Sequence, residues 1–416
     1  SAADLFMQEG MTEPVREMTT RLLESVTEIV VRGVADDRRL PEERVRAVLE
    51  RGPLSAKDAL AEGLVDHLGY RDEAYAAIKE RAKVKEPAVK FVERYGSTRV
   101  EALVGTVTRV PSRHRSVIGL IQASGQIVQG RSEGRSPIGG GSVGSDSLAA
   151  ALRNAGRDEH VKAVVLRIDS PGGSYIASDV IRREIQVLRE AGKPVVASMA
   201  SVAASGGYFI AMPCNHIFAN AGTITGSIGV LAGKHVLHAG LDRIGVHRET
   251  VASGPYAAMF SSNAAFTDDQ AKLLDDWLDE VYEDFTTKAA ADRGMGLADL
   301  QAVAKGRVWT GADACERGLV DELGGLSAAV AKACELAGVR RKHVDLRVIP
   351  KPHPLQMLMP AESSDALEAA LPLAHEGPGL WGSVLAGVEA QLGIGNLGVL
   401  SLPPLNLPGL LPALDR

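Results

Sequence analysis

Three short stretches of this chain combine serine with glycine in patterns that could support chemistry. They are "DSPGGS" (169–174), "SVAASGGYFIA" (201–211) and "TITGSIGV" (223–230). A serine hydroxyl becomes a nucleophile only when a base takes its proton, and the oxyanion that forms after its attack needs N–H donors. Glycine-rich turns can supply such donors from the main chain. The chemistry to consider is therefore nucleophilic catalysis by serine.

Ser205 is the candidate nucleophile in the second stretch. A predicted strand, Pro194–Ser201, ends four residues before it, and the apolar "GGYFIAM" (206–212) after it predicts a helix. At the start of that helix, the amides of Ser205 and Gly206 would point to a place where an oxyanion could form. Small residues also gather where backbones approach closely, so packing is the simpler interpretation of this stretch when it is taken alone.

Gly172 and Gly173 follow an apolar strand, Val161–Ser170, and precede a helix predicted from Tyr175 to about Ala191. Two glycines there could expose free amides at a helix N-terminus. The alternative is a tight turn capped by Ser174. In open α/β folds, however, sites gather at the carboxyl ends of strands.

The elements around these stretches alternate between strand and helix, which predicts an α/β fold. The first strand begins near Ser116, and helices are predicted around 147–155 and from Asp268 to about Gly294. A polar, glycine-rich stretch, 130–145, is predicted to be a surface loop.

The composition is that of an ordinary globular protein: 416 residues, 45% hydrophobic, 24% charged, with a net charge of -6. The negative charge argues against a nucleic-acid partner. Cys214, Cys315 and Cys334 form no CxxC pair, so we predict buried cysteines rather than disulfides or a metal site. The charge-free segment Gln391–Leu414 contains four prolines, which favours a docked or disordered tail over a membrane span.

An internal repeat relates the two ends of the chain at a gapless offset of 255 residues. "SAKDALAEGLVDHLG" (55–69) lies over "TGADACERGLVDELG" (310–324). Each copy predicts a long helix, a short helix and a strand-like "GLVD". We therefore predict a C-terminal part of a first repeat (1–80), a linker (81–115), a complete second repeat (116–342) and an extension (343–416). The rest of the first repeat is expected upstream of Ser1 in a longer protein.

The order and spacing of the three stretches, together with the repeat, resemble the signal peptide peptidase A (protease IV) family in its long, double-domain form. The resemblance implies a ClpP/crotonase-like superhelix of ββα units in a duplicated domain, of which only the second copy is complete here. It also implies a serine endopeptidase that cleaves hydrophobic peptides, such as cleaved signal peptides, through a Ser–Lys dyad and an acyl-enzyme. Neither a metal nor an organic cofactor is implied.

By the same resemblance, Ser205 is the nucleophile and Ser227 helps to orient the lysine. Gly172 or Gly173, together with Gly206, forms the oxyanion hole. In the family the lysine directly precedes a Ser-Ala segment that "SAADLFMQEG" (1–10) resembles. We therefore expect the lysine immediately upstream of Ser1, and expect this chain alone to be inactive or nearly so.

Other lysines fit the family pattern less well. The repeat places Pro255 at the position equivalent to the expected lysine, and proline cannot act as a base. Lys162 and Lys193 lie at the starts of predicted strands, and Lys234 follows the "TITGSIGV" turn.

The resemblance further implies a homo-oligomer (a tetramer), an upstream membrane anchor and a peptidase domain outside the cytoplasm at a bacterial membrane. Two alternatives stay open: a crotonase-type enzyme acting on acyl-CoA thioesters, and a non-catalytic assembly module.

Overall fold

The computed structural model describes residues 11–51, 54–69, 71–82, 116–132, 141–243, 245, 248–250 and 255–350. The segment 1–10, most of the predicted linker, half of the predicted loop, and the tail Gln391–Leu414 lie outside the described residues. The described residues fall into two compact units: 11–22 and 116–350 belong to the larger, and 23–82 to the smaller.

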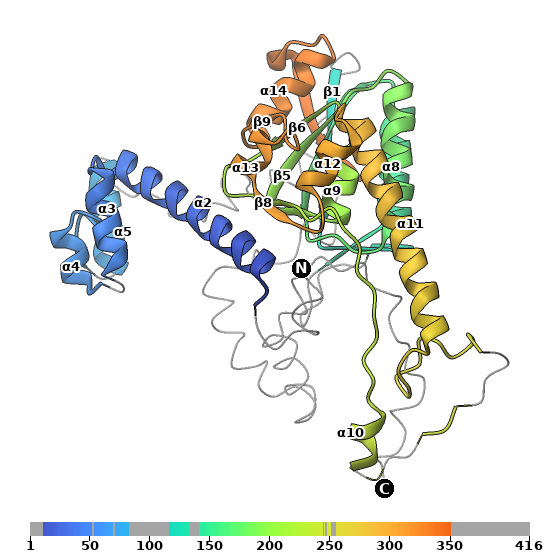
Figure 1. Ribbon diagram of the computed structural model, residues 1–416. Helices are drawn as coiled ribbons and strands as arrows, with labels where there is room; N and C mark the ends of the chain where they lie inside the picture. The colour runs from blue at the N-terminus through green and yellow to red at the C-terminus, as the bar shows by residue number, and fades with distance from the viewer. Residues whose placement is uncertain are drawn as a thin grey trace, which may run out of the picture. The chain divides into compact units, whose positions relative to one another are not determined.

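A mostly parallel sheet is the framework of the larger unit (Figure 1). Among the described residues its eight strands are β1 (Ser116–Ser124), β4 (Val161–Ser170), β5 (Val195–Ala204), β6 (His216–Ala219), β7 (Ile224–Gly226), β8 (Val308–Thr310), β9 (Glu322–Leu323) and β10 (Val344–Val348). The main order is β10-β1-β4-β5-β6-β9, with β7 paired to β5 and, antiparallel, to β8. The predicted α/β class is confirmed.

Helices cover both faces of this sheet. One core cluster contains Leu166 and Ile168 of β4 and side chains of α7 (Ser145–Arg157), α8 (Tyr175–Glu190), α9 (Gly206–Ala211) and α11 (Asp268–Arg293). The alternate β4 residues Ala163 and Val165 face α14 (Leu326–Leu336) instead. This alternation is the period of two that a strand buried on both faces requires.

Smaller elements complete the described part: β2 (Gln126–Val128), β3 (Ser142–Gly144), α10 (His238–Arg243), α12 (Leu297–Val303), α13 (Gly311–Glu316) and the 3₁₀ turn η2 (Arg341–His343). The predicted loop 130–145 thus ends in a strand, because β3 pairs with β2. Within the described residues, no helix is both long enough and apolar enough to cross a bilayer.

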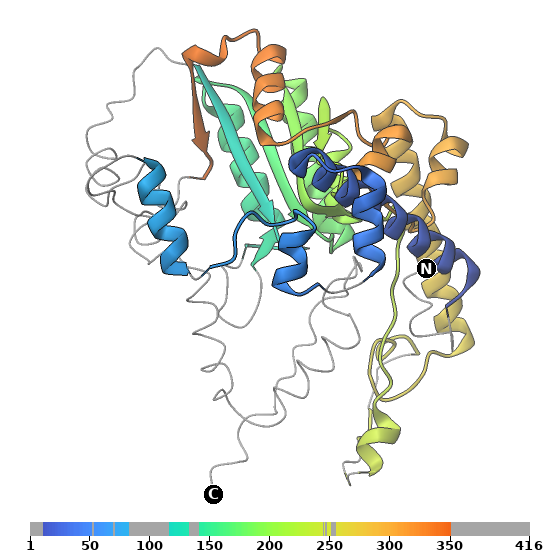
Figure 2. The ribbon, with the colours of Figure 1, turned by 90° about the vertical axis from the view of Figure 1, so that its left-hand side faces the viewer.

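Three further predictions need correction. Strand β5 does not end at Ser201 but continues to Ala204, because it pairs there with β7. The "GLVD" of the second repeat is a turn: Gly318 has φ +72° and the Leu319 amide donates back to Ala314 O, which ends α13. The sheet also continues past residue 342, since β10 pairs with β1 along its edge (Figure 2).

The cysteines match their prediction in part. Cys214 and Cys334 are free and buried, whereas Cys315 is free but only half-buried. Burial raises the pKa of the Cys214 thiol to about 12, which makes it an inert core side chain.

The four helices before residue 83 recur later in the chain at the offset of 255. Helices α2 (Glu13–Arg38), α3 (Glu42–Glu50), α4 (Ala56–Ala61) and α5 (Arg71–Ala82) start 255 residues before α11, α12, α13 and α14. Tertiary detail recurs as well. Arg38 Nε donates to Gly63 O (2.7 Å) and its guanidinium binds both oxygens of Asp66, while Arg293 makes the same bonds to Gly318 O (3.0 Å) and Asp321.

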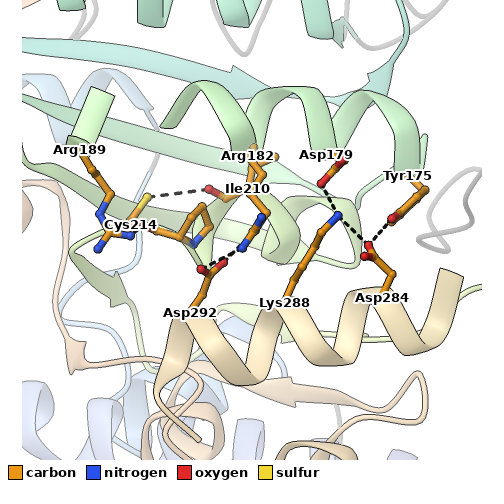
Figure 3. A network of polar contacts seen from close by, with 10 residues as sticks. Tyr175, Asp179, Arg182, Arg189, Ile210, Cys214, Asp284, Lys288 and Asp292 are labelled. Atoms are coloured by element: carbon orange, nitrogen blue, oxygen red, sulfur yellow. Dashed lines mark hydrogen bonds and ion pairs between the residues drawn. The ribbon is translucent and has the colours of Figure 1, made fainter. Parts of the chain in front are cut away.

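A row of polar contacts fixes α11 against α8 (Figure 3). Lys288 Nζ lies 2.7 Å from carboxylate oxygens of both Asp179 and Asp284, and the Tyr175 hydroxyl donates to Asp284. Burial is the main cause that raises the pKa of Tyr175 to about 12, and the hydrogen bond to Asp284 is the second. Farther along, Arg182 Nε donates to Asp292 Oδ2 at 2.8 Å. The start of α8, directly after the Gly172–Gly173 turn, is therefore held by several charged groups.

We predict that Phe285→Ala lowers the free energy of unfolding by about 3–5 kcal/mol, because it opens a cavity in the core. Phe285 is 1% exposed and its ring centroid lies 4.7 Å from that of Phe209 on α9. Urea denaturation measures the loss. Leu273→Ala on the same helix, at a side chain 48% exposed, is the control and should change it by no more than about 0.5 kcal/mol. Equal losses in the two variants would contradict this packing.

Candidate active site

The carboxyl ends of β4, β5 and β7 bring the three serine–glycine stretches together. Ser170 pairs with Ala203, and Ala204 pairs with Gly226. Because all three strands run parallel, the chain leaves each of them at the same edge of the sheet. Ser205 and Ser227 therefore follow neighbouring strand ends, beside the turn that begins at Ser170.

Ser205 occupies a sharp turn between β5 and α9. It has φ +51° and ψ −119°, a conformation that non-glycine residues rarely adopt and that costs about 1–3 kcal/mol. Its amide donates to Gly226 O at 2.9 Å, and its carbonyl accepts the Phe209 amide at 2.9 Å, so the turn is held from both sides. The residue is 1% exposed, and its Oγ has no hydrogen-bond partner among the described residues. Such a buried, unpaired hydroxyl calls for a functional explanation.

The turn after β4 packs directly against Ser205. A Cβ at Gly172 would lie 2.8 Å from both Gly206 N and Ser205 Cβ, and Gly172 has φ +109°. A Cβ at Gly206 would lie 2.6 Å from Ser178 Oγ. Glycine is required at both positions because each side of this contact is already filled.

Two amides near Ser205 are available as donors. Gly206 is the first residue of α9, so its N–H lies among the amides that have no intrahelical acceptor. The Ile127 amide donates to the Gly172 carbonyl, and the Ser174 amide donates to the Ile127 carbonyl. The Gly173 amide between them takes no part in this bridge. A Cβ at Gly206 would lie 3.2 Å from Gly173 N, so the two glycines are close neighbours. The pair has the chemical character of an oxyanion hole.

Ser227 has the same kind of strained backbone as Ser205. It follows β7 with φ +50°, is half-buried, and its amide donates to Arg307 O at 2.7 Å. Because Gly226 accepts the Ser205 amide, the two serines are fixed through adjacent residues.

Comparison with known proteins gives the family of this chain. Residues 1–85 and 187–340 match Peptidase family S49. The chain belongs to that family. Its relatives include the chloroplastic serine protease SPPA of Arabidopsis thaliana, 35% identical over 344 residues (82% of this chain, 49% of that protein). Protease 4 of Salmonella typhi is 34% identical over 387 residues (89% and 60%). A putative protease of Synechocystis is 39% identical over 217 residues (52% and 78%).

Membership in family S49 carries the ClpP/crotonase-like fold, which confirms the predicted fold class at that level. The chain spans only 49% and 60% of the first two relatives. The two segments that match the family end at residues 85 and 340, and 340 − 85 gives the repeat offset of 255.

Two of the three lysines weighed from the sequence, Lys193 and Lys234, are hydrogen-bonded elsewhere in this S49 chain. Lys193 Nζ donates to the carbonyls of Ala155, Gly156 and Asp158 at 2.7–2.9 Å, at the end of α7. Lys234 Nζ donates to Met259 O at 2.6 Å, over the Phe266 ring. Burial lowers the pKa of both lysines.

Some positioning residues were not predicted. Trp309 of β8 fills the space beside Gly226, where a Cβ would lie 2.9 Å from the Trp309 ring. Asp169 Oδ1 accepts the Val202 amide at 3.1 Å and stiffens the end of β5. The sequence offers one hint, since Asp169 directly precedes "SPGGS". The contact of the Arg307 carbonyl with the Ser227 amide could not be predicted, because it involves main-chain atoms that every residue type has.

We predict that Gly172→Ala lowers the free energy of unfolding by about 1–3 kcal/mol more than Gly192→Ala does, because only the former overpacks a filled contact. Gly192 is the matched control: it has φ +77°, and a Cβ there would meet nothing within 4 Å. Its own loss should be about 1–2 kcal/mol from backbone strain alone. Chemical denaturation of both variants gives the comparison, and equal losses would refute the tight contact at Ser205.

Proposed function

We propose that this S49 chain carries the nucleophile half of a serine endopeptidase that cleaves hydrophobic peptides, such as cleaved signal peptides. The observation that carries the proposal is the Ser205 hydroxyl, which is buried, has no hydrogen-bond partner among the described residues, and sits on a strained strand-to-helix turn. A sharp turn of this kind presents a serine Oγ in other hydrolases. The protease names of the relatives point the same way.

The chemistry follows from the groups around Ser205. A neutral lysine takes the hydroxyl proton while Oγ attacks the carbonyl carbon of the peptide bond. The carbonyl oxygen becomes negative, and the Gly173 and Gly206 amides stabilise it. The tetrahedral intermediate then collapses to an ester on Ser205, and the leaving amine takes its proton from the lysine. Water, activated by the same base, hydrolyses the ester and frees the second product.

For the base we propose the lysine that the family resemblance implies upstream of Ser1, with Ser227 orienting it. The first repeat would supply this lysine and the second repeat the nucleophile. Ser227 suits this role because it directly follows Gly226, whose strand β7 pairs with the end of β5 just before Ser205.

The smaller unit supports a larger first repeat. In the second repeat, Val281, Phe285 and Val320 are 4%, 1% and 2% exposed because the sheet and its helices cover them. Their counterparts at the offset of 255 are Val26, Val30 and Val65, which are 39%, 43% and 38% exposed. We infer that an equivalent α/β layer covers this face in the natural protein, since so many exposed valines would otherwise face water.

The alternative of an acyl-CoA enzyme has less support. Crotonase-type enzymes usually rely on carboxylates near the site, whereas Asp169 Oδ1 accepts the Val202 amide here. The homo-oligomer and an attachment to a bacterial membrane through an upstream anchor are further proposals, which rest on the family alone.

We predict that Ser205→Ala in the natural full-length protein lowers kcat for a hydrophobic peptide by several orders of magnitude, because no other group can form the ester. It should also abolish labelling by a fluorophosphonate probe. Ser201→Ala is the control, since Ser201 lies on the same strand but is exposed to solvent. A retained rate in Ser205→Ala would refute the proposal.

The source of the base has its own test. Replacing the residue before Ser1 in the full-length protein should remove activity as fully as Ser205→Ala. Adding the upstream segment to the 416-residue chain should raise its rate. Comparable peptidase rates with and without that segment would contradict a base from the first repeat.

A further inference from the structure

Two ion pairs join the N-terminal part of helix α2 to the segment 307–313, which contacts the Ser227 backbone. Arg21 Nη2 donates to Asp313 Oδ1 at 2.6 Å, and Arg307 Nη2 donates to Glu17 Oε1 at 2.6 Å. Glu17 and Arg21 are four residues apart, so they lie on one face of the helix. The chain up to Leu22 belongs to the larger unit, so all four residues lie within that unit.

Asp313 is the buried member of this group. Its side chain is 2% exposed, against 40% for Arg21. Oδ1 also lies 3.4 Å from Arg317 Nη1, while Oδ2 is buried without a hydrogen-bond partner among the described residues. A buried carboxylate is unfavourable unless cations or donors compensate it. The Arg21 guanidinium, the nearer of the two cations, therefore contributes directly to holding this turn.

The segment 307–313 leads from these ion pairs to the site. At one end, the Arg307 carbonyl accepts the Ser227 amide, and Val308 pairs with Gly226 across the β7–β8 ladder. At the other end, Thr310 caps α13 by accepting the Asp313 amide at 3.1 Å. Helix α2 thus contacts both ends of the segment 307–313, whose first residue accepts the Ser227 amide.

The equivalent positions in the other repeat make different contacts. At the offset of 255, Glu17 and Arg21 correspond to Lys272 and Asp276, which pair with each other at 2.6 Å on the surface (73% and 62% exposed). Asp313 corresponds to Asp58, which is exposed and accepts the Ser55 hydroxyl at 2.6 Å. The contacts of α2 are therefore not a general feature of the repeat. Among the described residues, they are made by a helix of the first repeat and the segment beside Ser227.

We propose that Arg21, supported by Glu17, is a positioning residue for the peptidase site: it fixes the start of α2 relative to the turn that holds Ser227. The inference rests on the proposed function, because the proposed base precedes α2 in the chain and must meet Ser205 beside Ser227. Proton transfer needs the base and Oγ at hydrogen-bond distance. Loss of the Arg21 contact should therefore slow the chemical step more than it weakens peptide binding.

The test compares Arg21→Gln with Arg16→Gln in the natural full-length protein. Arg16 is the matched control because it lies on the same helix in a loose 3.8 Å pair with Glu13, at side chains 62% and 85% exposed. Arg21→Gln should lower kcat by about 10- to 100-fold, the effect of a misplacement near 1 Å, and leave KM within about twofold. Arg16→Gln should leave both constants within about twofold of the unmodified protein.

Two further variants separate positioning from simple loss of structure. Arg21→Lys keeps the cation and should recover part of kcat. The double variant Asp313→Asn with Arg21→Gln should lower kcat no further than the more damaging of the two single variants. Both substitutions remove the same Arg21–Asp313 ion pair, so their effects should not add. Rates are divided by the folded fraction from thermal unfolding. The inference is overturned if kcat per folded protein in Arg21→Gln equals that in Arg16→Gln, or if the losses of the two single variants multiply.

Ser205→Ala, assayed in parallel, keeps the two proposals apart. If Ser205→Ala retains the rate, the peptidase function itself fails and the positioning role falls with it. If Ser205→Ala is inactive while Arg21→Gln matches Arg16→Gln, only the positioning role fails.

Discussion

The contact between the 170–174 turn and Ser205 is the constraint on which the site depends. Two parallel strands end side by side, and the chains that leave them must pass within contact distance. Gly172 and Gly206 permit this because neither carries a Cβ that would collide with the other turn. The same crowding holds Ser205 at φ +51°, a strained conformation that an isolated turn would relax. The strain is balanced by the core behind it, where Tyr208 and Phe209 are 0% and 1% exposed.

The sequence predicted the turns better than the element ends. Glycine and serine at strand-to-helix transitions have local causes, so the three stretches and their strands could be located. The end of β5 could not, because Val202–Ala204 is poor in strand-forming residues and is extended only by its pairing with β7. The reverse error occurred at "GLVD", where Leu319 and Val320 are apolar and buried like a strand, yet lie in a turn set by Gly318.

Contacts distant in sequence explain most of what could not be predicted. Arg307 and Ser227 meet through main-chain atoms, for which any residue type would serve. Arg21 and Asp313 are separated by 292 residues, and neither periodicity nor local propensity relates them. Both contacts are decided by which strands lie next to each other. Such long-range pairing depends on the whole sheet, and no window of sequence contains it.

The duplication distinguishes contacts that recur in both copies from contacts that one copy makes. Arg38–Asp66 and Arg293–Asp321 recur in both copies with the same hydrogen-bond pattern, and burial of Asp321 is outweighed by its bonds to Arg293, which keep its pKa low. These pairs tie a long helix to the turn after a short one in both copies. Arg21 and Asp313 have counterparts of different charge or exposure in the other copy. A shared fold fixes no function by itself, so the division of labour that we propose between the two copies would reside in such unequal positions.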